Sequence, residues 1–271
     1  MQLLNLYFMK IYSISALCAA ALITLSGCSV ANSIDMNRLA QGGAKMAQSL
    51  TVTNSQIQEY VKSYVAQTDA KSTVCTANDP YTKRLAKIVS GITSVEGIPL
   101  NFKVYRTNDI NAFACADGSI RVYSGLMDTM DDDEVLGVIG HEIGHVAHQD
   151  TKNAFKNALQ TAALMDLLSS TSSTVATLTD SQLGAIAQNL ASAKFSKSQE
   201  NNADDYGYTF LKQHGKNPAA MVKAFKKLQK MEQSSGQRPS SGLAQLFSTH
   251  PDISKRIQRM QAKCKADGYA Y

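Results

Sequence analysis

Two short helices are predicted at the start of the patterned part of the chain. Between Ser55 and Gln67 the apolar residues fall on one helical face, as Ile57, Tyr60, Val61, Tyr64 and Val65. The stretch NDPYTKRLAKIVSGI predicts a second helix, because Asn78 or Asp79 can cap it and Pro80 fits its first turn.

Two later stretches show alternation of apolar and polar residues in place of the helical period. LNFKVYRT, at 100–107, and SIRVYSGLM, at 119–127, alternate as the strands of a half-buried sheet do. NDINAFACADG lies between them, and its Asp117-Gly118 pair is a turn signal. These stretches predict a small β-sheet.

The stretch DTMDDDEVLGVIGHEIGHVAHQD, at 128–150, predicts one buried helix. Its acidic cluster from Asp131 to Glu134 suits a helix N-terminus, where the helix dipole favours negative charge. The apolar residues that follow can bury the helix: Val135, Leu136, Val138, Ile139, Ile143 and Val146. Gly137, Gly140 and Gly144 lower its helix propensity, so we expect close packing against another element to explain them.

Beyond Asp150 the pattern is helical to the end of the chain. Helices are predicted over about 152–170, 181–213, 217–233 and 252–266. The polar stretch SSTSSTVATLTDS, at 169–181, predicts a loop between the first two. Together these patterns predict an α+β fold that is mainly α-helical.

Length and composition fit one globular domain. The chain has 271 residues, 44% of them hydrophobic, which is enough to form one core. The net charge is +5, but the most basic stretch, KAFKKLQK at 223–230, has helical spacing and is interpreted as a solvated face. Basic residues are not interleaved with aromatic ones as in nucleic-acid-binding proteins, so no nucleic-acid partner is expected.

The N-terminal stretch MKIYSISALCAAALITLSGCS indicates export. Its apolar run is too short for a membrane span and ends in small residues, as secretory signals do. Leu25-Ser26-Gly27-Cys28 resembles a bacterial lipobox, in which Cys28 becomes the acylated first residue; the alternative is an ordinary signal with a nearby cysteine. By resemblance to Gram-negative lipoproteins, Ser29 favours the outer membrane. We therefore expect a signal at 1–27, a lipidated tether at 28–53 and a periplasm-facing domain at 54–271.

Three cysteines remain after Cys18 leaves with the signal and Cys28 takes lipid. Three is an odd number, so at most one disulfide forms within the domain. An oxidising periplasm permits the pair Cys75–Cys115, which we favour, while the alternative is three free thiols including Cys264.

GVIGHEIGHVAHQD, at 137–150, contains the pattern H-E-x-x-H and predicts a metal site. His141 and His145 leave one helix face about a turn apart, where two ring nitrogens can reach one ion at about 2.0–2.1 Å. Glu142 lies about 100° further round the helix, so it can act on the hydrolytic water instead of the metal. The alternative is a chance pentapeptide or a pair of core histidines.

The third ligand is not expected to be His148. On an unbroken helix this residue lies about 10 Å along the axis from His141, too far to share an ion. The metzincin pattern H-E-x-x-H-x-x-G-x-x-H does not fit either, because His148 stands at its glycine position and Thr151 at its final histidine.

KFSKSQENNADDYGYTF, at 194–210, supplies a better third ligand. Glu200 can complete a His₂Glu site, and Asp204, one turn later, can reach the second nitrogen of a ligand histidine. Asp205 points off that face. The alternative for this stretch is an ordinary acidic helix surface.

Four motifs occur in the order NAFACADGSIRVYSGLM, GHEIGHVAHQD, SKSQENNADDYG and STHPDISKRI. Through them, residues 80 to 262 resemble the zinc metallopeptidases of the HtpX and CAAX-prenyl-protease family, and within it the LoiP-like outer-membrane lipoproteins. The resemblance implies a gluzincin-type zincin domain whose small sheet has its edge strand facing the active-site helix, with one Zn²⁺ per chain. The zinc ligands it implies are His141, His145 and Glu200, with Glu142 as the base and Asp204 as the supporting carboxylate.

Two departures from the family pattern are modest. The multiple membrane spans of HtpX and the prenyl protease are absent from the sequence pattern, which argues against intramembrane or prenyl substrates. Asp117-Gly118 stands where the family usually has Gly-Gly.

His250 in STHP stands where periplasmic relatives place a histidine that can approach the zinc. It is either a transition-state hydrogen-bond donor or a fourth ligand that closes the site until substrate displaces it. The alternative is a surface histidine beside Pro251. Arg256 can anchor this segment to an acidic helix.

These residues predict a metalloendopeptidase that hydrolyses unfolded or misfolded envelope proteins. An extended substrate is expected to pair with the strand that carries Ser119, Arg121 and Tyr123, taken as the sheet edge.

A second hypothesis is a latent peptidase that acts mainly as an outer-membrane assembly factor or chaperone, and a third is a zinc-stabilised structural lipoprotein. Partners under these hypotheses are the membrane, through the lipid, and other envelope proteases or assembly factors. Glu142 argues against both alternatives as sole functions, because neither needs a base beside the metal.

Overall fold

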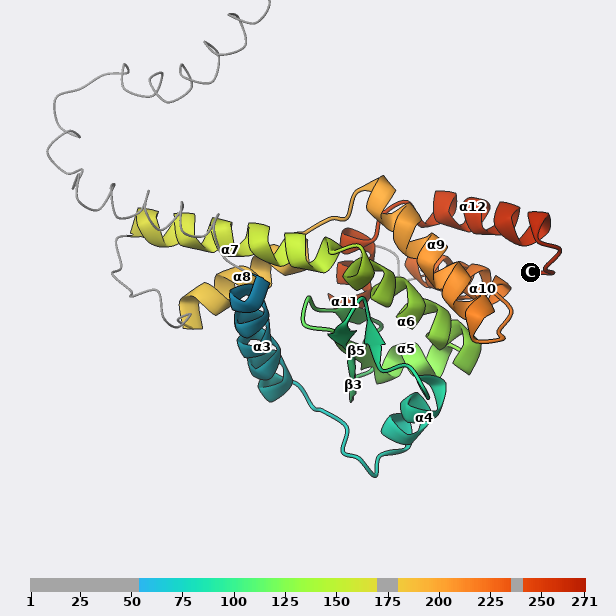
Figure 1. Ribbon diagram of the computed structural model, residues 1–271, viewed down its shortest axis with the longest axis horizontal. Helices are drawn as coiled ribbons and strands as arrows, with labels where there is room; N and C mark the ends of the chain where they lie inside the picture. The colour runs from blue at the N-terminus through green and yellow to red at the C-terminus, as the bar shows by residue number, and fades with distance from the viewer. Residues whose placement is uncertain (1–53, 170–179, 235–240) are drawn as a thin grey trace, which may run out of the picture. The chain divides into compact units, whose positions relative to one another are not determined.

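A computed structural model describes residues 54–169, 180–234 and 241–271 (Figure 1). The expected signal segment, the lipidation site Cys28 and the tether to residue 53 lie outside these ranges, as does most of the polar loop expected at 169–181. In the part that is described, no helix combines the length and apolar character needed to cross a membrane.

The two N-terminal helices form where the pattern predicts them. α3 spans Asn54–Lys71, and α4 spans Pro80–Ile88. The side chain of Asp79 caps α4 by accepting a hydrogen bond from the Tyr81 N–H, and Pro80 lies in the first turn.

The strands form two small sheets. β1 (Ser94–Val95) and β2 (Ile98–Pro99) make an antiparallel pair that the sequence pattern did not predict. β3 (Asn101–Tyr105), β4 (Ala112–Ala114) and β5 (Ser119–Tyr123) form the main sheet in the order β3-β5-β4. β5 is parallel to β3 and antiparallel to β4.

The expectation that β5 is the edge strand is wrong. β5 is hydrogen-bonded on both sides, so it has no free backbone edge for a substrate. Ser119 and Arg121 are also buried, and the Arg121 guanidinium, 1% exposed, is engaged by Asp69 of α3. The edge strand next to the helix that carries H-E-x-x-H, α6 (Asp132–Ala147), is β4.

α5 (Ser124–Thr129) leads into the central helix α6 (Asp132–Ala147). Asp131 and Glu134 form a capping box that starts α6, as the acidic cluster predicts. The helix is buried along nearly its whole length. It ends where Gln149 adopts a positive φ of 61°, and α7 (Asp150–Ser169) begins at the next residue.

The described residues of the C-terminal half form two more helices than predicted, because one expected helix is split in two and one helix was not expected. α8 (Asp180–Ser192) and α9 (Lys197–Gln213) are separate helices, because Ser196 and Gln199 form a capping box that starts α9. α10 (Ala219–Ser234) and α12 (Ile253–Ala266) match the predicted ranges. Between them lies α11 (Ser241–Thr249), which the periodicity did not reveal.

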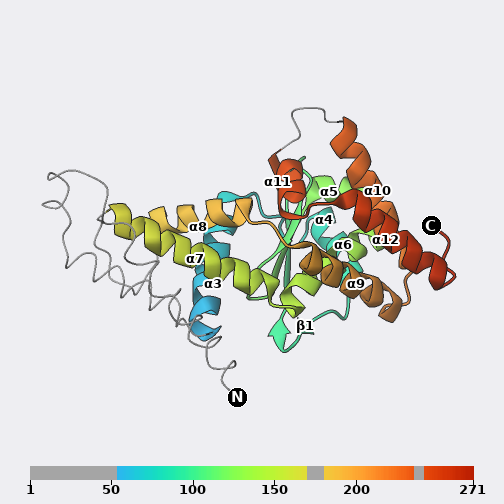
Figure 2. The same ribbon diagram turned by 90° about the horizontal axis from the view of Figure 1, so that it is seen from above.

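The glycines of α6 do reflect close packing, and their partner is α9. A Cβ on Gly144 would lie 2.9 Å from Ala203 Cα, and one on Gly140 would lie 3.2 Å from Gly207 Cα. Figure 2 shows α9 and α6 side by side, with α12 and α10 nearby. This contact brings the second acidic motif next to the H-E-x-x-H motif.

Two groups of buried apolar residues stabilise the domain. The larger surrounds α6 and includes Ile120, Ile139, Leu211 and Met260. The smaller joins α3, α7 and α8 through Ile57, Val61, Phe155 and Ile186. Figures 1 and 2 show α3, α7 and α8 together on one side of the sheet.

The favoured disulfide between Cys75 and Cys115 is wrong, since both are free thiols, as is Cys264. Cys75 packs against the larger apolar group, while Cys115 is buried in the smaller one, so the two thiols belong to different clusters. The alternative of three free thiols is the one that the structure has.

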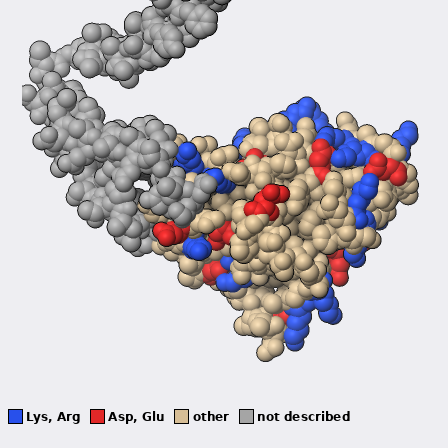
Figure 3. Space-filling model, in the orientation of Figure 1, with Lys and Arg blue, Asp and Glu red and all other residues tan. Residues whose placement is uncertain are grey.

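Basic and acidic side chains alternate over the surface drawn in Figure 3. Lys212 pairs with Asp267 at 2.8 Å, and Lys216 pairs with Asp133 at 2.7 Å. On this face the excess positive charge is therefore not gathered into one patch.

Candidate metal centre

Four side chains from three parts of the chain converge on one point. They are His141 and His145 of α6, Glu200 of α9 and His250, which directly follows α11. One ligand atom from each lies within 4.8 Å of the others, and all four residues are buried. The structure thus brings together the three predicted ligands and the predicted fourth histidine.

The distances suit a small tetrahedral ion. His141 Nε2 lies 3.2 Å from His145 Nε2, and the Glu200 oxygens lie 3.7 Å from the first nitrogen and 3.4 Å from the second. Ligands placed about 2.0–2.1 Å from a tetrahedral zinc are separated from one another by about 3.3 Å. His250 Nδ1 completes the set at 3.0 Å from Glu200 Oε1 and 3.3 Å from His141 Nε2.

Each α6 histidine has a carboxylate on its other nitrogen. His141 Nδ1 lies 2.9 Å from Asp204 Oδ1, as the spacing of Asp204 after Glu200 predicts. His145 Nδ1 lies 2.9 Å from Asp150 Oδ2, which the sequence analysis missed. These contacts fix the ring orientations and leave both Nε2 atoms directed at the common point.

Arg256 links two acidic residues of α9, Glu200 and Asp204. Its guanidinium donates to both oxygens of Asp204, at 2.6 and 3.0 Å, and lies 2.7 Å from Glu200 Oε2. It also stacks over the Phe225 ring, 4.4 Å from the centroid. The expected anchoring of the His250 segment to an acidic helix is confirmed.

The electrostatics of the cluster follow from burial and these partners. Burial alone would raise the pKa of Asp204, but Arg256 and His141 outweigh it and hold that pKa at about 2. Burial alone would lower the pKa of His145, but Asp150 and Glu200 raise it to about 9. His141 has its pKa lowered by burial and by the nearby Arg256.

The donor set fits zinc. Glu200 Oε2 is buried and accepts no hydrogen bond from the described residues, although Arg256 is close enough for an ion pair. A buried carboxylate oxygen left in this state is available to a cation. Two imidazoles and a carboxylate form a His₂Glu set, which is typical of catalytic zinc.

Glu142 lies beside this cluster and not in it. Its Oε2 accepts a hydrogen bond from the Ala114 N–H of β4 at 3.1 Å, and its Oε1 lies 3.7 Å from His250 Nε2. The predicted base therefore stands between the metal ligands and the edge strand.

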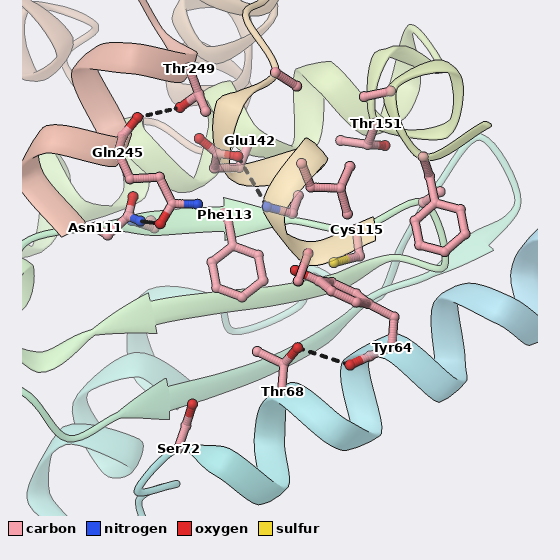
Figure 4. A pocket seen from close by; sticks show the side chains of 18 of the residues that line it. Tyr64, Thr68, Ser72, Asn111, Phe113, Cys115, Glu142, Thr151, Gln245 and Thr249 are labelled. Atoms are coloured by element: carbon pink, nitrogen blue, oxygen red, sulfur yellow. Dashed lines mark hydrogen bonds between the residues drawn. The ribbon is translucent and has the colours of Figure 1, made fainter. Parts of the chain in front are cut away.

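A pocket of about 380 Å³ opens along this edge strand (Figure 4). Its walls come from α3, β4, α7, α8 and α11, and Glu142, Tyr123 and His250 reach it. Of the three residues expected to bind substrate, only Tyr123 lines the pocket. Ser119 hydrogen-bonds to Asp117, and Arg121 to Asp69.

Two contributors escaped the sequence analysis, and the reasons differ. Asp150 is five residues from His145, which is no contact distance on an unbroken helix, and only the backbone turn at Gln149 brings it back. Phe195 stacks on the His145 ring at 3.9 Å between centroids, but it lies in a connection predicted to be helical. The one sequence signal for either residue was the carboxylate of Asp150, which comes just after the helix that carries H-E-x-x-H.

His148 stays outside the cluster, as expected. Its Nδ1 lies 2.7 Å from the Gly144 carbonyl oxygen at the end of α6. Asp205 pairs with Arg259 and Lys263, away from the ligands.

Comparison with known proteins agrees with this geometry. The model of peptidase family M48 matches residues 77–263, well over half of the chain. The chain belongs to peptidase family M48. It is 39% identical over 261 residues to the metalloprotease LoiP of Escherichia coli, covering 96% of this chain and 99% of LoiP.

More distant members of the M48 family are also similar. The metalloprotease YcaL of Escherichia coli is 36% identical over 244 residues, covering 90% of this chain and 92% of YcaL. A protease HtpX homologue of Methanopyrus kandleri is 28% identical over 221 residues, covering 66% of each chain. Family membership and the His/Glu cluster make this M48 protein a zinc metalloendopeptidase with a mainly helical, zincin-like domain.

Proposed function

We propose that this M48 metallopeptidase is a lipid-anchored envelope enzyme that cleaves unfolded or misfolded polypeptides, with Glu142 as its base. The position of Glu142 carries the proposal. The carboxylate lies between the ligand cluster and the free edge of β4, so one peptide bond can meet both at once.

The ligands that would hold zinc are His141, His145 and Glu200, with His250 as a fourth donor within reach. When bound, zinc supplies Lewis-acid chemistry, polarising a peptide carbonyl and lowering the pKa of water. Asp204 and Asp150 orient the two α6 imidazoles for this role.

Proton transfer falls to Glu142. Its carboxylate takes a proton from the attacking water and delivers it to the leaving nitrogen, which needs one group to reach both atoms in turn. The Ala114 N–H keeps the carboxylate turned towards the edge strand, on which the substrate nitrogen would lie.

Substrate binding is assigned to β4 in place of β5. Tyr123 N–H donates to the Asn111 carbonyl, and Cys115 N–H to the Ser119 carbonyl, so the odd-numbered residues face β5. The backbone groups of Ala112 and Ala114 consequently face away from β5. Their N–H groups donate to Asn111 Oδ1 and Glu142 Oε2, so a substrate strand would pair with their carbonyl groups or displace these side chains. An extended chain that pairs there is recognised through its backbone, which suits unfolded proteins of varied sequence.

The envelope assignment is supported by the N-terminal sequence alone. An apolar run that ends in Leu25-Ser26-Gly27-Cys28 fits an exported lipoprotein, and Ser29 fits the outer membrane. Incorporation of labelled palmitate tests this: the chain should take up label, and Cys28→Ala should not. Label on Cys28→Ala, or none on either chain, contradicts the lipid anchor.

The peptidase mechanism is tested by casein cleavage with the full chain, beside Glu142→Gln and the control Glu59→Gln on the exposed face of α3. We expect all three proteins to bind about one zinc, and only Glu142→Gln to lose activity. Retained cleavage in Glu142→Gln would remove Glu142 from the mechanism, and loss of zinc in that variant would make it a ligand.

A second candidate is a latent peptidase that serves mainly as an assembly factor or chaperone for outer-membrane proteins. The observation that favours it is His250, whose Nδ1 stands with the ligands while its Nε2 faces Glu142. His250→Ala separates the two roles left open by the sequence. Faster cleavage indicates a closing ligand, and slower cleavage at unchanged zinc content indicates a hydrogen-bond donor to the reaction.

A further inference from the structure

The hydroxyl of Thr151 is buried without a partner. Thr151 is 7% exposed, and its Oγ1 makes no hydrogen bond to any described residue. Two other buried side-chain atoms of the described chain share this state, Thr82 Oγ1 and Glu200 Oε2. Glu200 Oε2 is explained by its ion pair with Arg256 and its place among the candidate metal ligands, which leaves the two hydroxyls.

An unsatisfied hydroxyl has a stability cost. Removing it from water without a new hydrogen bond is unfavourable, and buried polar groups in folded proteins nearly always find a partner. A hydroxyl that faces a binding pocket differs from one inside a core, because a ligand can supply the missing partner.

Thr151 lines such a pocket, although its hydroxyl oxygen is buried in the structure. It lies in the first turn of α7 and lines the groove together with Glu142, Phe155 and Phe195. Figure 4 shows Thr151, Glu142 and Cys115 around the same hollow. Thr82 lies on α4 and is not among the residues that line this groove.

We propose that Thr151 is a substrate-binding residue: its hydroxyl, buried in the structure, rotates about the Cα–Cβ bond and hydrogen-bonds the backbone of a polypeptide held in the groove. The inference rests on the peptidase function and on β4 as the substrate edge. A chain paired along β4 directs alternate backbone groups away from that strand, towards the other walls of the groove. A hydroxyl both donates and accepts, so it can meet a substrate N–H or C=O there.

The position of Thr151 also fits this role. Asp150, the preceding residue, holds His145, and the turn at Gln149 sets the direction of both residues. The same break in the helix that orients a zinc ligand therefore places Thr151 in the wall of the groove.

The test compares Thr151→Val with Thr82→Val, which removes the other unpartnered hydroxyl. Both variants lose a destabilising group, so both should melt about 2–4 °C higher than the parent chain. Only Thr151→Val should also lower kcat/KM for casein, by about 2- to 10-fold, through KM. Unchanged KM and kcat in Thr151→Val would overturn the proposal, because a purely structural hydroxyl predicts that result.

A binding measurement separates failure of this proposal from failure of the mechanism. In the Glu142→Gln background, fluorescein-labelled β-casein should bind about 2- to 10-fold more weakly when Thr151→Val is added, and equally well when Thr82→Val is added. Equal binding by all three proteins would overturn the role of Thr151 and leave the peptidase assignment intact. If Glu142→Gln itself shows no binding, the groove is not the substrate site and the proposal fails with it.

Discussion

Asp150 Oδ2 lies 2.9 Å from His145 Nδ1, although five residues separate them along the chain. The contact exists because α6 stops and Gln149 turns the backbone, so that the first residue of α7 points back at the last ligand of α6. The other oxygen of Asp150 accepts a hydrogen bond from Gln199, the neighbour of Glu200. One carboxylate thus joins the histidine side and the glutamate side of the site.

We therefore expect Asp150→Asn to weaken zinc binding by about 10- to 100-fold, since groups that orient a ligand histidine have effects of this size. The measurement is zinc affinity by competition with a chromogenic chelator. Asp205→Asn is the matched control, because Asp205 pairs with Arg259 and Lys263 away from the cluster. Equal zinc affinity in the two variants would show that Asp150 does not support the site.

Arg256 is expected to matter most in the metal-free protein. Arg256→Met leaves the buried carboxylates of Glu200 and Asp204 without their counter-charge, a loss of about 3–5 kcal/mol in the free energy of unfolding. Zinc supplies part of the missing positive charge, so the melting temperature should fall more with a chelator present than with zinc. Arg259→Met, which removes a partly exposed ion pair, should lose about 1 kcal/mol or less under both conditions. An equal fall with and without zinc would contradict this account.

Acid should weaken the attachment of α3 to the sheet. Burial favours a higher pKa for Asp69, but hydrogen bonds from Arg121, Lys103 and Tyr105 outweigh it and hold the pKa at about 2, below its ordinary value of 3.8. A lowered folded-state pKa stabilises the protein above pH of about 4, and this contribution is lost as pH falls towards about 2. Urea unfolding should show Asp69→Asn to be about 2 kcal/mol less stable at pH 7, with the difference shrinking below pH 4. A difference that does not change with pH would contradict the assignment.

The close contact of α6 with α9 predicts a cost for added volume. In Gly144→Ala the new Cβ would lie 2.9 Å from Ala203 Cα, so the helices must separate, at about 1–3 kcal/mol. That cost exceeds the gain of up to about 1 kcal/mol from replacing a helical glycine. Gly184→Ala on α8 meets no atom within 4 Å and should gain stability instead. Thermal melting checks both signs, and a more stable Gly144→Ala would refute the packing account.

Local sequence patterns predicted much of the fold and of the metal site. H-E-x-x-H fixes two ligands and a base by helix geometry alone, and Glu200 with Asp204 repeats that logic three helices later, on α9. The helix starts at Asp79 and at the acidic cluster Asp131–Glu134 also follow from the sequence, although the capping box at Asp131 was not predicted.

The misses came from information that is not local. Whether β5 is an edge or a centre depends on which strands pair, and alternation in SIRVY does not encode its neighbours. The split at Phe195 is an exception, because the capping box of Ser196 and Gln199 is a local signal that periodicity does not register. Periodicity also did not reveal α11. Whether Cys75 and Cys115 form a disulfide likewise depends on their distance in space, which the sequence does not give.

The shortness of β4 has a consequence for the proposed cleavage of unfolded chains. Long open strand edges recruit other strands and seed aggregates, and unfolded proteins are rich in segments ready to join them. β4 offers only the residues Ala112–Ala114, inside a groove bordered by helices. An edge of this length can pair with one extended segment during cleavage, but it is too short to act as a template for aggregation.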